Sequence, residues 1–138
     1  NIPVELGNLS NIQVLGVSEN QLTGTIPATL GNLTNLTGLF MSDNQLTGGI
    51  PSELSNLSLT SFTVSNNQLT GSVPAWLGNM VGMQFLLLYG NQLSGCFDPN
   101  LSNLCSVPTI DFSNNPGLPG SGDFADFCAS AFDRCFVR

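Results

Sequence analysis

Cysteine and aspartate are the residue types in this chain best suited to chemistry, and most of them lie near the C-terminus. The cysteines are Cys96, Cys105, Cys128 and Cys135, and the last stretch also holds Asp123, Asp126 and Asp133. Acid–base catalysis at neutral pH usually recruits histidine, and the chain has no histidine. A carboxylate pair that joins Asp111 to an acid of another segment is formally available, but no spacing supports it. We therefore predict no enzymatic activity.

The cysteines fit disulfides better than catalysis or metal binding. A nucleophilic cysteine needs a free thiolate beside a base, and no C-x-x-C spacing typical of zinc sites occurs. Four cysteines allow three pairings, and we favour Cys96 with Cys105 and Cys128 with Cys135 because each pair closes a short loop. Residues seven apart on an ideal helix are about 10.5 Å apart, whereas a disulfide needs less than about 7 Å between Cα atoms. A helix here must therefore break before Cys135, or this pairing is wrong.

The composition is acidic and excludes several classes of partner. The 138 residues include nine Asp and Glu and two Lys and Arg, which gives a net charge of −7. Binding to nucleic acid through a basic footprint is excluded, and so is docking on anionic lipid. Calcium binding is an alternative for the late aspartates, but a solvated surface explains them more simply, and we predict no metal and no cofactor. No apolar run approaches a membrane span, and paired cysteines favour an oxidising, extracellular compartment.

An asparagine recurs at intervals of 24, 23, 24 and 24 residues, which indicates an internal repeat. The recurring residues are Asn20, Asn44, Asn67, Asn91 and Asn115. The short interval comes from one residue missing between Leu57 and Phe62. Ahead of each asparagine, apolar residues alternate with period two, as at Leu15 and Val17, and predict a short strand with one buried face. Stacked as parallel strands about 4.8 Å apart, the repeats close a continuous core.

The repeated asparagines have a mechanical role in this scheme. A side-chain amide both donates and accepts hydrogen bonds, so it can pair the peptide groups of a tight buried turn. Leaving such groups unpaired would cost about 1 to 3 kcal/mol each. We therefore expect a structural asparagine ladder through the stacked repeats.

The repeat frame resembles the extracellular leucine-rich repeats of the plant-type subfamily. The resemblance rests on the half-repeat LTGxIP at 22–27 and 46–51, with valine replacing isoleucine at 69–74, and it covers residues 1 to about 118. It implies a repeat solenoid with a parallel sheet on the concave face, short second strands, and an irregular or 3₁₀ convex side. The stretch after Cys96 is similar to the C-terminal caps of secreted plant-type arrays. We therefore assign 1–95 to repeat coils and 96–138 to the last coil and a disulfide-stabilised cap.

The cap sequence predicts a short helix. Phe124, Phe127, Cys128 and Ala131 fall at helical spacing, with Asp123 or Ser121 as N-cap. Its apolar side would cover the last coil, as the end of a solenoid requires.

Strand alternation identifies the residues that face outward from the sheet, and one strand stands out. Phe85, Leu87 and Tyr89 place three large side chains on the solvent side, beside Thr63 and other small hydroxyl residues. An apolar cluster rimmed by hydroxyls is typical of an interface centre. We predict a concave ligand-binding surface made of Phe40, Thr63, Phe85, Leu87, Tyr89 and Asp111. Packing of this cluster against the cap is the alternative.

These features favour a secreted or cell-surface module that binds a protein, peptide or small ligand without covalent chemistry. Two alternatives belong to other classes. Thr23, Thr47, Thr70 and Ser94 recur at one repeat position, as an ice-binding surface requires, although turn geometry also explains them. A structural spacer or adhesin segment without a discrete ligand is the other alternative.

The remaining features concern the N-terminus and modification. The sequence begins inside a repeat, so we expect Ile2, Leu6 and Leu9 to form an exposed apolar end that further repeats would cover. Five asparagines open N-x-S/T sequons, which are glycosylation sites in a eukaryotic secretory pathway. They are Asn8, Asn32, Asn35, Asn56 and Asn100.

Overall fold

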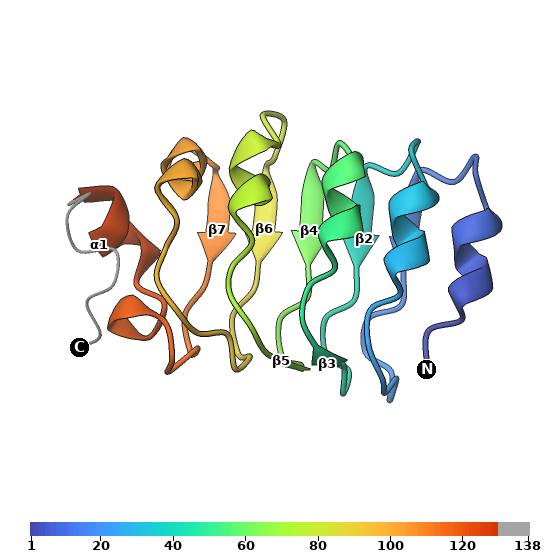
Figure 1. Cartoon of the computed structure of the whole chain (residues 1–138), viewed down its shortest axis with the longest axis horizontal. Coiled ribbons are helices and arrows are strands. Elements are labelled where there is room, and N and C mark those ends of the chain that lie inside the picture. The colour runs from blue at the N-terminus through green and yellow to red at the C-terminus, as the bar shows by residue number, and fades with distance from the viewer. Residues whose placement is uncertain (130–138) are drawn as a thin grey trace.

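Residues 1–129 are described by the structure, a computed structural model, and they form a stack of similar coils (Figure 1). Each coil carries a strand on one side of the stack and a 3₁₀ helix on the other. Five strands form one sheet: β1 (Val14–Gly16), β2 (Gly38–Phe40), β4 (Ser61–Thr63), β6 (Phe85–Leu87) and β7 (Thr109–Asp111). We number the coils 1 to 5 after these strands.

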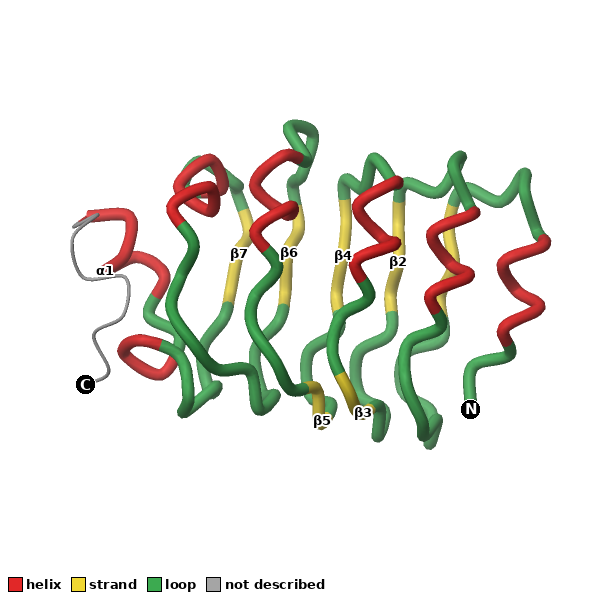
Figure 2. The backbone as a smooth tube through the Cα atoms, in the orientation of Figure 1, coloured by secondary structure: helices red, strands yellow, loops and turns green. Residues whose placement is uncertain are grey.

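The sheet is parallel throughout, and its register follows the repeat. Leu15 is opposite Leu39, then Phe62, Leu86 and Ile110 on the successive strands. The missing residue in coil 3 is absorbed before β4, so that strand stays in register. The predicted fold class, a leucine-rich repeat solenoid with one parallel sheet, is confirmed. Figure 2 shows the strands side by side behind the helices.

The helices lie on the side opposite the sheet. They are η1 (Val4–Asn8), η2 (Ala28–Asn32), η3 (Ser52–Asn56), η4 (Ala75–Asn79) and η5 (Pro99–Leu104). A proline precedes each of the first four, because its fixed φ and missing N–H suit a helix start. Glycine lets neighbouring helices approach, because a Cβ on Gly31 would clash with the Glu53 carbonyl oxygen.

Short second strands connect the sheet to the helices. β3 (Thr47–Gly48) pairs in parallel with β5 (Gln68–Leu69), and a single bridge joins Thr25 to Thr47. The glycine of each T-G turn has positive φ, for example +76° at Gly48, which glycine adopts without strain.

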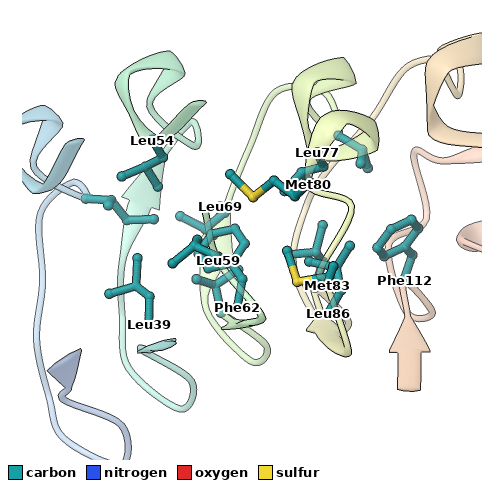
Figure 3. Close-up of a cluster of buried hydrophobic side chains, with 14 of the residues drawn as sticks. Leu39, Leu54, Leu59, Phe62, Leu69, Leu77, Met80, Met83, Leu86 and Phe112 are labelled. Atoms are coloured by element: carbon teal, nitrogen blue, oxygen red, sulfur yellow. The ribbon is translucent and has the colours of Figure 1, made fainter. Parts of the chain in front are cut away.

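The core is a continuous apolar column between sheet and helices. Figure 3 shows Leu39, Phe62 and Leu86 from adjacent strands beside the helix residues Leu54 and Leu77. All five are fully buried. Because each coil contributes one layer, the core grows with every repeat.

The repeated asparagines join neighbouring coils. The Asn67 Oδ1 accepts from the Leu46 N–H at 3.0 Å, and the Asn67 Nδ2 donates to the Met41 carbonyl of the preceding coil at 3.0 Å. Asn44, Asn91 and Asn115 repeat both bonds, and all four side chains are buried. Asn20 is exposed and bonds only to carbonyls of its own coil.

The cap covers coil 5 with aromatic side chains. After η6 (Pro119–Ser121), Asp123 directly precedes α1 (Phe124–Ala129), and its Oδ1 accepts from the Asp126 N–H at 3.0 Å. Asp123 is thus the N-cap, one of the two residues predicted. Phe124 of α1 packs against Phe97 and Phe112, and Phe127 packs against Phe97, with ring centroids 4.8 to 5.5 Å apart. Ala131 lies outside the described residues.

The disulfide pairing differs from the prediction. Cys105 is bonded to Cys128, with the Cα atoms 5.7 Å apart, so neither favoured pair, Cys96–Cys105 or Cys128–Cys135, forms. Cys96 is also disulfide-bonded, and Cys135 lies outside the described residues. The preference for short loops was wrong because packing decides proximity. The buried phenylalanines pack α1 against coil 5, and this packing places Cys128 next to Cys105 at the end of η5.

The predicted apolar N-terminal end is only partly present. Leu9 is exposed and Leu6 is half-buried, but Ile2 is buried. Ile2 occupies the Ile-Pro position of its repeat, where Ile26 and Val73 are also buried, so it faces coil 2. The division into coils up to residue 95 and a cap from residue 96 stays a prediction.

Candidate functional site

The outer face of the five-stranded sheet, predicted above as the concave face, carries two rows of side chains along the register. We call it the sheet surface. The first row is Val14, Gly38, Ser61, Phe85 and Thr109, and the second is Gly16, Phe40, Thr63, Leu87 and Asp111. Five of the six predicted binding residues therefore lie within two adjacent rows.

β6 carries the largest outward side chains. Phe85 is 46% exposed, and Leu87 and Tyr89 are half-buried. Tyr89 follows the strand, where its carbonyl accepts from the Asn66 N–H at 2.9 Å. Alternation along β6 turns Leu86 and Leu88 into the core instead. The three side chains, Phe85, Leu87 and Tyr89, consequently form one apolar strip that runs along β6 on the sheet surface.

Phe40 adds a second aromatic group two strands away. A Cβ built on Gly38 would lie 2.9 Å from the Phe40 Cε2, so the ring lies over this glycine. Phe40 is half-buried as a result. Gly38 thus makes room for the ring to lie close to the sheet.

The hydroxyl residues between these aromatic groups contribute little exposed surface. Thr63, in register between Phe40 and Leu87, is 8% exposed, and Ser65 is 2% exposed. The Ser65 hydroxyl donates to the Ser42 hydroxyl at 2.8 Å, and the Ser42 N–H donates to the Ser18 hydroxyl at 3.1 Å. Sequence reasoning placed these hydroxyl residues on the solvent side, but Thr63 and Ser65 are buried, and the serines hydrogen-bond between coils.

One carboxylate lies beside the strip, and a second lies two coils away from it. Asp111 is half-buried beside Leu87, and its Oδ1 accepts from the Ser113 N–H at 2.9 Å. Asp43 accepts a bond of 2.9 Å from the Asn66 Nδ2. The sequence places no lysine, arginine or histidine before Arg134, so every charged side chain on this part of the chain is negative.

Sequence reasoning missed a column of left-handed residues at the end of the strands. The residue before each repeated asparagine has positive φ: Glu19, Asp43, Asn66, Gly90 and Asn114. Asparagine, aspartate and glycine adopt this conformation most readily, so the recurrence of these types before the asparagine was the available signal. The column forms a polar edge directly after Tyr89.

The threonines considered for ice binding are exposed but out of register. Thr47 pairs with Thr25 on one side and with Gln68 on the other, rather than with Thr23 and Thr70. The four residues Thr23, Thr47, Thr70 and Ser94 are all exposed. The backbone pairing therefore does not place them opposite one another.

A cavity of about 770 Å³ lies between β7 and the cap, and sequence reasoning did not anticipate it. Its lining includes Ile110, Phe112, Phe124 and Cys128, together with Asp111 from the edge of the sheet surface. Within residues 1–129 no group of three or more histidine, cysteine or acidic residues is placed to hold a metal ion. In the same part of the chain no helix is long and apolar enough to cross a membrane.

Comparison with known proteins identifies the repeat. The family described as Leucine Rich Repeat matches residues 11–33, 35–57 and 58–80. No curated protein shows a significant match to the chain.

Solved structures resemble the fold closely. The leucine-rich repeat ectodomain of the plant membrane receptor kinase GASSHO1/SCHENGEN3 from Arabidopsis thaliana, in complex with CASPARIAN STRIP INTEGRITY FACTOR 2, is 40% identical with a TM-score of 0.80. That alignment covers 83% of this chain and 14% of the receptor. The Arabidopsis receptor kinase HAESA, in complex with the peptide hormone IDA and the co-receptor SERK1, is 36% identical with a TM-score of 0.80, over 84% and 20%.

A plant ice-binding protein is also similar. It is 31% identical with a TM-score of 0.78, and the alignment covers 83% of this chain and 37% of that protein. In the two receptor alignments, by contrast, the chain spans only 14% of GASSHO1/SCHENGEN3 and 20% of HAESA. With three matched repeats and this stack of coils, the chain belongs to the leucine-rich repeat family, and its fold is that of plant receptor ectodomains.

Proposed function

We propose that the chain is an extracellular recognition module that binds a protein or peptide through the sheet surface. The centre of the interface is the strip of Phe85, Leu87 and Tyr89, with Phe40 as a second anchor. Thr63 and Asp111 lie in the same row as Leu87. No covalent chemistry is involved, and we propose no enzymatic activity.

The observation that carries this proposal is the exposure of Phe85. A phenylalanine that is 46% exposed on β6, the fourth of the five strands, with Leu87 on the same strand and Tyr89 directly after it, leaves apolar area in water. Removing such area from water is favourable by roughly 25 cal/mol per Å², from which the entropic costs of association are subtracted. Aromatic anchors of this kind dominate the energy of protein interfaces.

The charges around the strip favour a neutral or basic partner. Asp111 lies beside the strip and Asp43 lies two coils away from it, and no basic side chain occurs before Arg134. Complementary charge raises the rate of association and is screened by salt. Binding of a basic partner should therefore weaken as the salt concentration rises.

The related structures support the same proposal. Two of the similar ectodomains were determined with a peptide hormone or a factor bound. A disulfide between coil and cap fits an oxidising compartment. We therefore place the chain outside the cell, secreted or on the cell surface.

Ice binding is a second candidate because a plant ice-binding protein shares the fold. A flat lattice of hydroxyls needs threonines in register, and Thr47 pairs instead with Gln68. Turn geometry accounts for the threonines. Measurement of thermal hysteresis separates the two functions, and we expect none. A spacer without a ligand is the third candidate, and it would capture no specific partner.

The experiment is capture of partners from extracellular material of the source organism on the immobilised chain. The test variant is Phe85→Ala, Leu87→Ala, Tyr89→Ala. The matched control is Val4→Ala, Leu9→Ala, Val81→Ala, which truncates exposed apolar side chains outside the sheet surface. Circular dichroism and hydrogen exchange first establish that both variants are folded.

A partner that is held by the original chain and the control, but lost by the test variant, supports the sheet surface as the site. Equal capture by the test variant contradicts it. Capture of nothing specific by any of the three favours the spacer.

A further inference from the structure

Among the five sequons, we propose that Asn8, Asn32 and Asn56 carry N-linked sugars on the helix side of coils 1 to 3, while Asn35 and Asn100 do not. This inference rests on the proposed extracellular location and not on partner binding. The five sites look alike in sequence. Their surroundings in the fold separate them.

The three proposed sites occupy one structural position. Asn8, Asn32 and Asn56 are the last residues of η1, η2 and η3, the three helices coloured blue to green in Figure 1. All three are exposed, and within residues 1–129 their side-chain amides make no hydrogen bond. A sugar on their Nδ2 therefore costs no interaction of the fold.

The backbone at two of these sites turns in the same way. The Ser10 N–H donates to the Asn8 carbonyl at 2.9 Å, and the Thr34 N–H donates to the Asn32 carbonyl at 3.0 Å. The hydroxyl residue of each sequon thus follows its asparagine in a tight turn. Ser10, Thr34 and Ser58 are themselves exposed.

Asn100 is in a different environment. It is half-buried, and its Nδ2 donates to the Ala75 carbonyl at 2.8 Å and to the Asn79 Oδ1 at 3.0 Å. Those two bonds use both amide protons, and a sugar replaces one of them. A chain with a sugar at Asn100 would lose contacts that join coil 5 to coil 4.

Asn35 is exposed, but its Nδ2 donates to the Ser10 carbonyl of the preceding coil at 3.0 Å. A substituent on this nitrogen would lie against coil 1. It would also stand three residues from Asn32, so two branched sugars would compete for the same space. Both effects favour Asn32 over Asn35.

Attachment of the sugar is a transfer of an oligosaccharide to the asparagine side chain. A lipid-linked oligosaccharide pyrophosphate is the donor, and a C–N bond forms between its anomeric carbon and the asparagine Nδ2. The anomeric carbon–oxygen bond breaks, the lipid pyrophosphate leaves, and the amide nitrogen gives up one proton to the transferase.

Coil 4 supplies an internal control. Asn79 ends η4 at the equivalent position, and the Val81 N–H donates to its carbonyl at 3.1 Å, but Val81 replaces the hydroxyl residue. Val81 is fully exposed. Asn79 would therefore carry no sugar, and the helix side of coil 4 would be unmodified at this position.

The test is secretion of the full chain from a eukaryotic host, followed by site mapping. Removal of N-linked sugars by a peptide glycosidase in ¹⁸O water converts each modified asparagine to labelled aspartate, which mass spectrometry locates. We expect label at Asn8, Asn32 and Asn56 in the folded secreted protein. Ser10→Ala, Thr34→Ala and Ser58→Ala should each remove one sugar, and Ser102→Ala should remove none.

Val81→Thr completes the sequon at Asn79 and should add one sugar. Label at Asn100 or Asn35 equal to that at Asn32 overturns the proposal, and so does secreted, folded protein without label at the three sites. Because this mapping does not measure capture of a partner, its failure is distinct from failure of the proposed recognition function.

Discussion

The two ends of the described chain are built from the same repeat but differ in how they are covered. In coil 1, Val17 is half-buried and Asn20 is exposed. In coil 5, Phe112 and Asn115 are completely covered. The difference lies in the neighbours, because coil 1 has a coil on one side whereas coil 5 lies between coil 4 and the cap. Equivalent residues therefore contribute different free energies at the two ends.

This comparison shows that stability in the stack is assigned by contact with neighbouring coils and not by the sequence of one repeat. Each inner coil has two apolar interfaces, and the free energy of unfolding is approximately a sum over such interfaces. In place of a further coil, the cap packs Phe124 and Phe127 against Phe97 and Phe112 and is joined to coil 5 by a disulfide.

Truncation of a core leucine should give the largest difference. Leu39→Ala in coil 2 should lower the free energy of unfolding by about 3 to 5 kcal/mol, because Leu39 is fully buried and the change leaves a cavity. Leu15→Ala, at the register partner in coil 1, should cost less than half as much. Urea unfolding followed by circular dichroism gives both values. Equal losses would show that coil 1 is as well covered as coil 2.

Removal of the coil-to-cap disulfide should act locally at the C-terminal end. Cys105→Ser with Cys128→Ser opens a loop of 23 residues, which costs about 3 kcal/mol in the chain-entropy treatment. Hydrogen exchange should show lost protection first in β7 and α1. Trp76, the single tryptophan of the chain, lies in coil 4 and reports by fluorescence on the next layer. Loss of protection that begins in coil 1 would contradict a sealing role for this bond.

Much of the fold could be predicted because the same residue types recur at the same positions of every repeat. A period near 24 residues, alternation around Leu15 and an asparagine after each strand are enough to specify stacked parallel strands. The Asn-to-backbone bonds follow from the amide's two-sided chemistry. The helical spacing of the cap sequence left Asp123 and Ser121 as possible N-caps, and the structure selects Asp123.

The disulfide and the hydroxyl residues could not be predicted in the same way. The partner of Cys105 depends on how α1 docks on coil 5, which is decided by Phe97 and Phe112 from distant parts of the sequence. Alternation gives the side of the sheet on which Thr63 lies, but its exposure depends on the size of its neighbours Phe40 and Leu87. The cavity beside β7 likewise arises from docking and has no local signature.

The asparagine ladder offers a comparison of intermediate size. Asn67→Ala should lower the free energy of unfolding by about 1 to 3 kcal/mol, since it leaves the Leu46 N–H and buried carbonyls without their partner. Asn20→Ala should cost clearly less, because the Asn20 side chain is exposed and bonds only within its own coil. Asn44→Ala should fall close to Asn67→Ala. Unchanged melting of the Asn67 variant would count against the ladder as a source of stability.

The smallest effect should be a gain in stability at coil 1. Glu19 has a φ of +57° at the position where Asn66 and Asn114 have 54° and 55°, and the left-handed conformation disfavours glutamate more than asparagine. Glu19→Asn should therefore raise the free energy of unfolding by about 0.5 to 1 kcal/mol. Glu19→Gln removes the same charge without changing the backbone preference, so it serves as the control and should leave stability unchanged. If both variants gain equally, the benefit comes from lost repulsion with neighbouring acids such as Asp43. If only Glu19→Asn gains stability, coil 1 contributes less to the free energy of unfolding than the inner coils for two reasons. It packs against one coil instead of two, and its backbone is strained at Glu19.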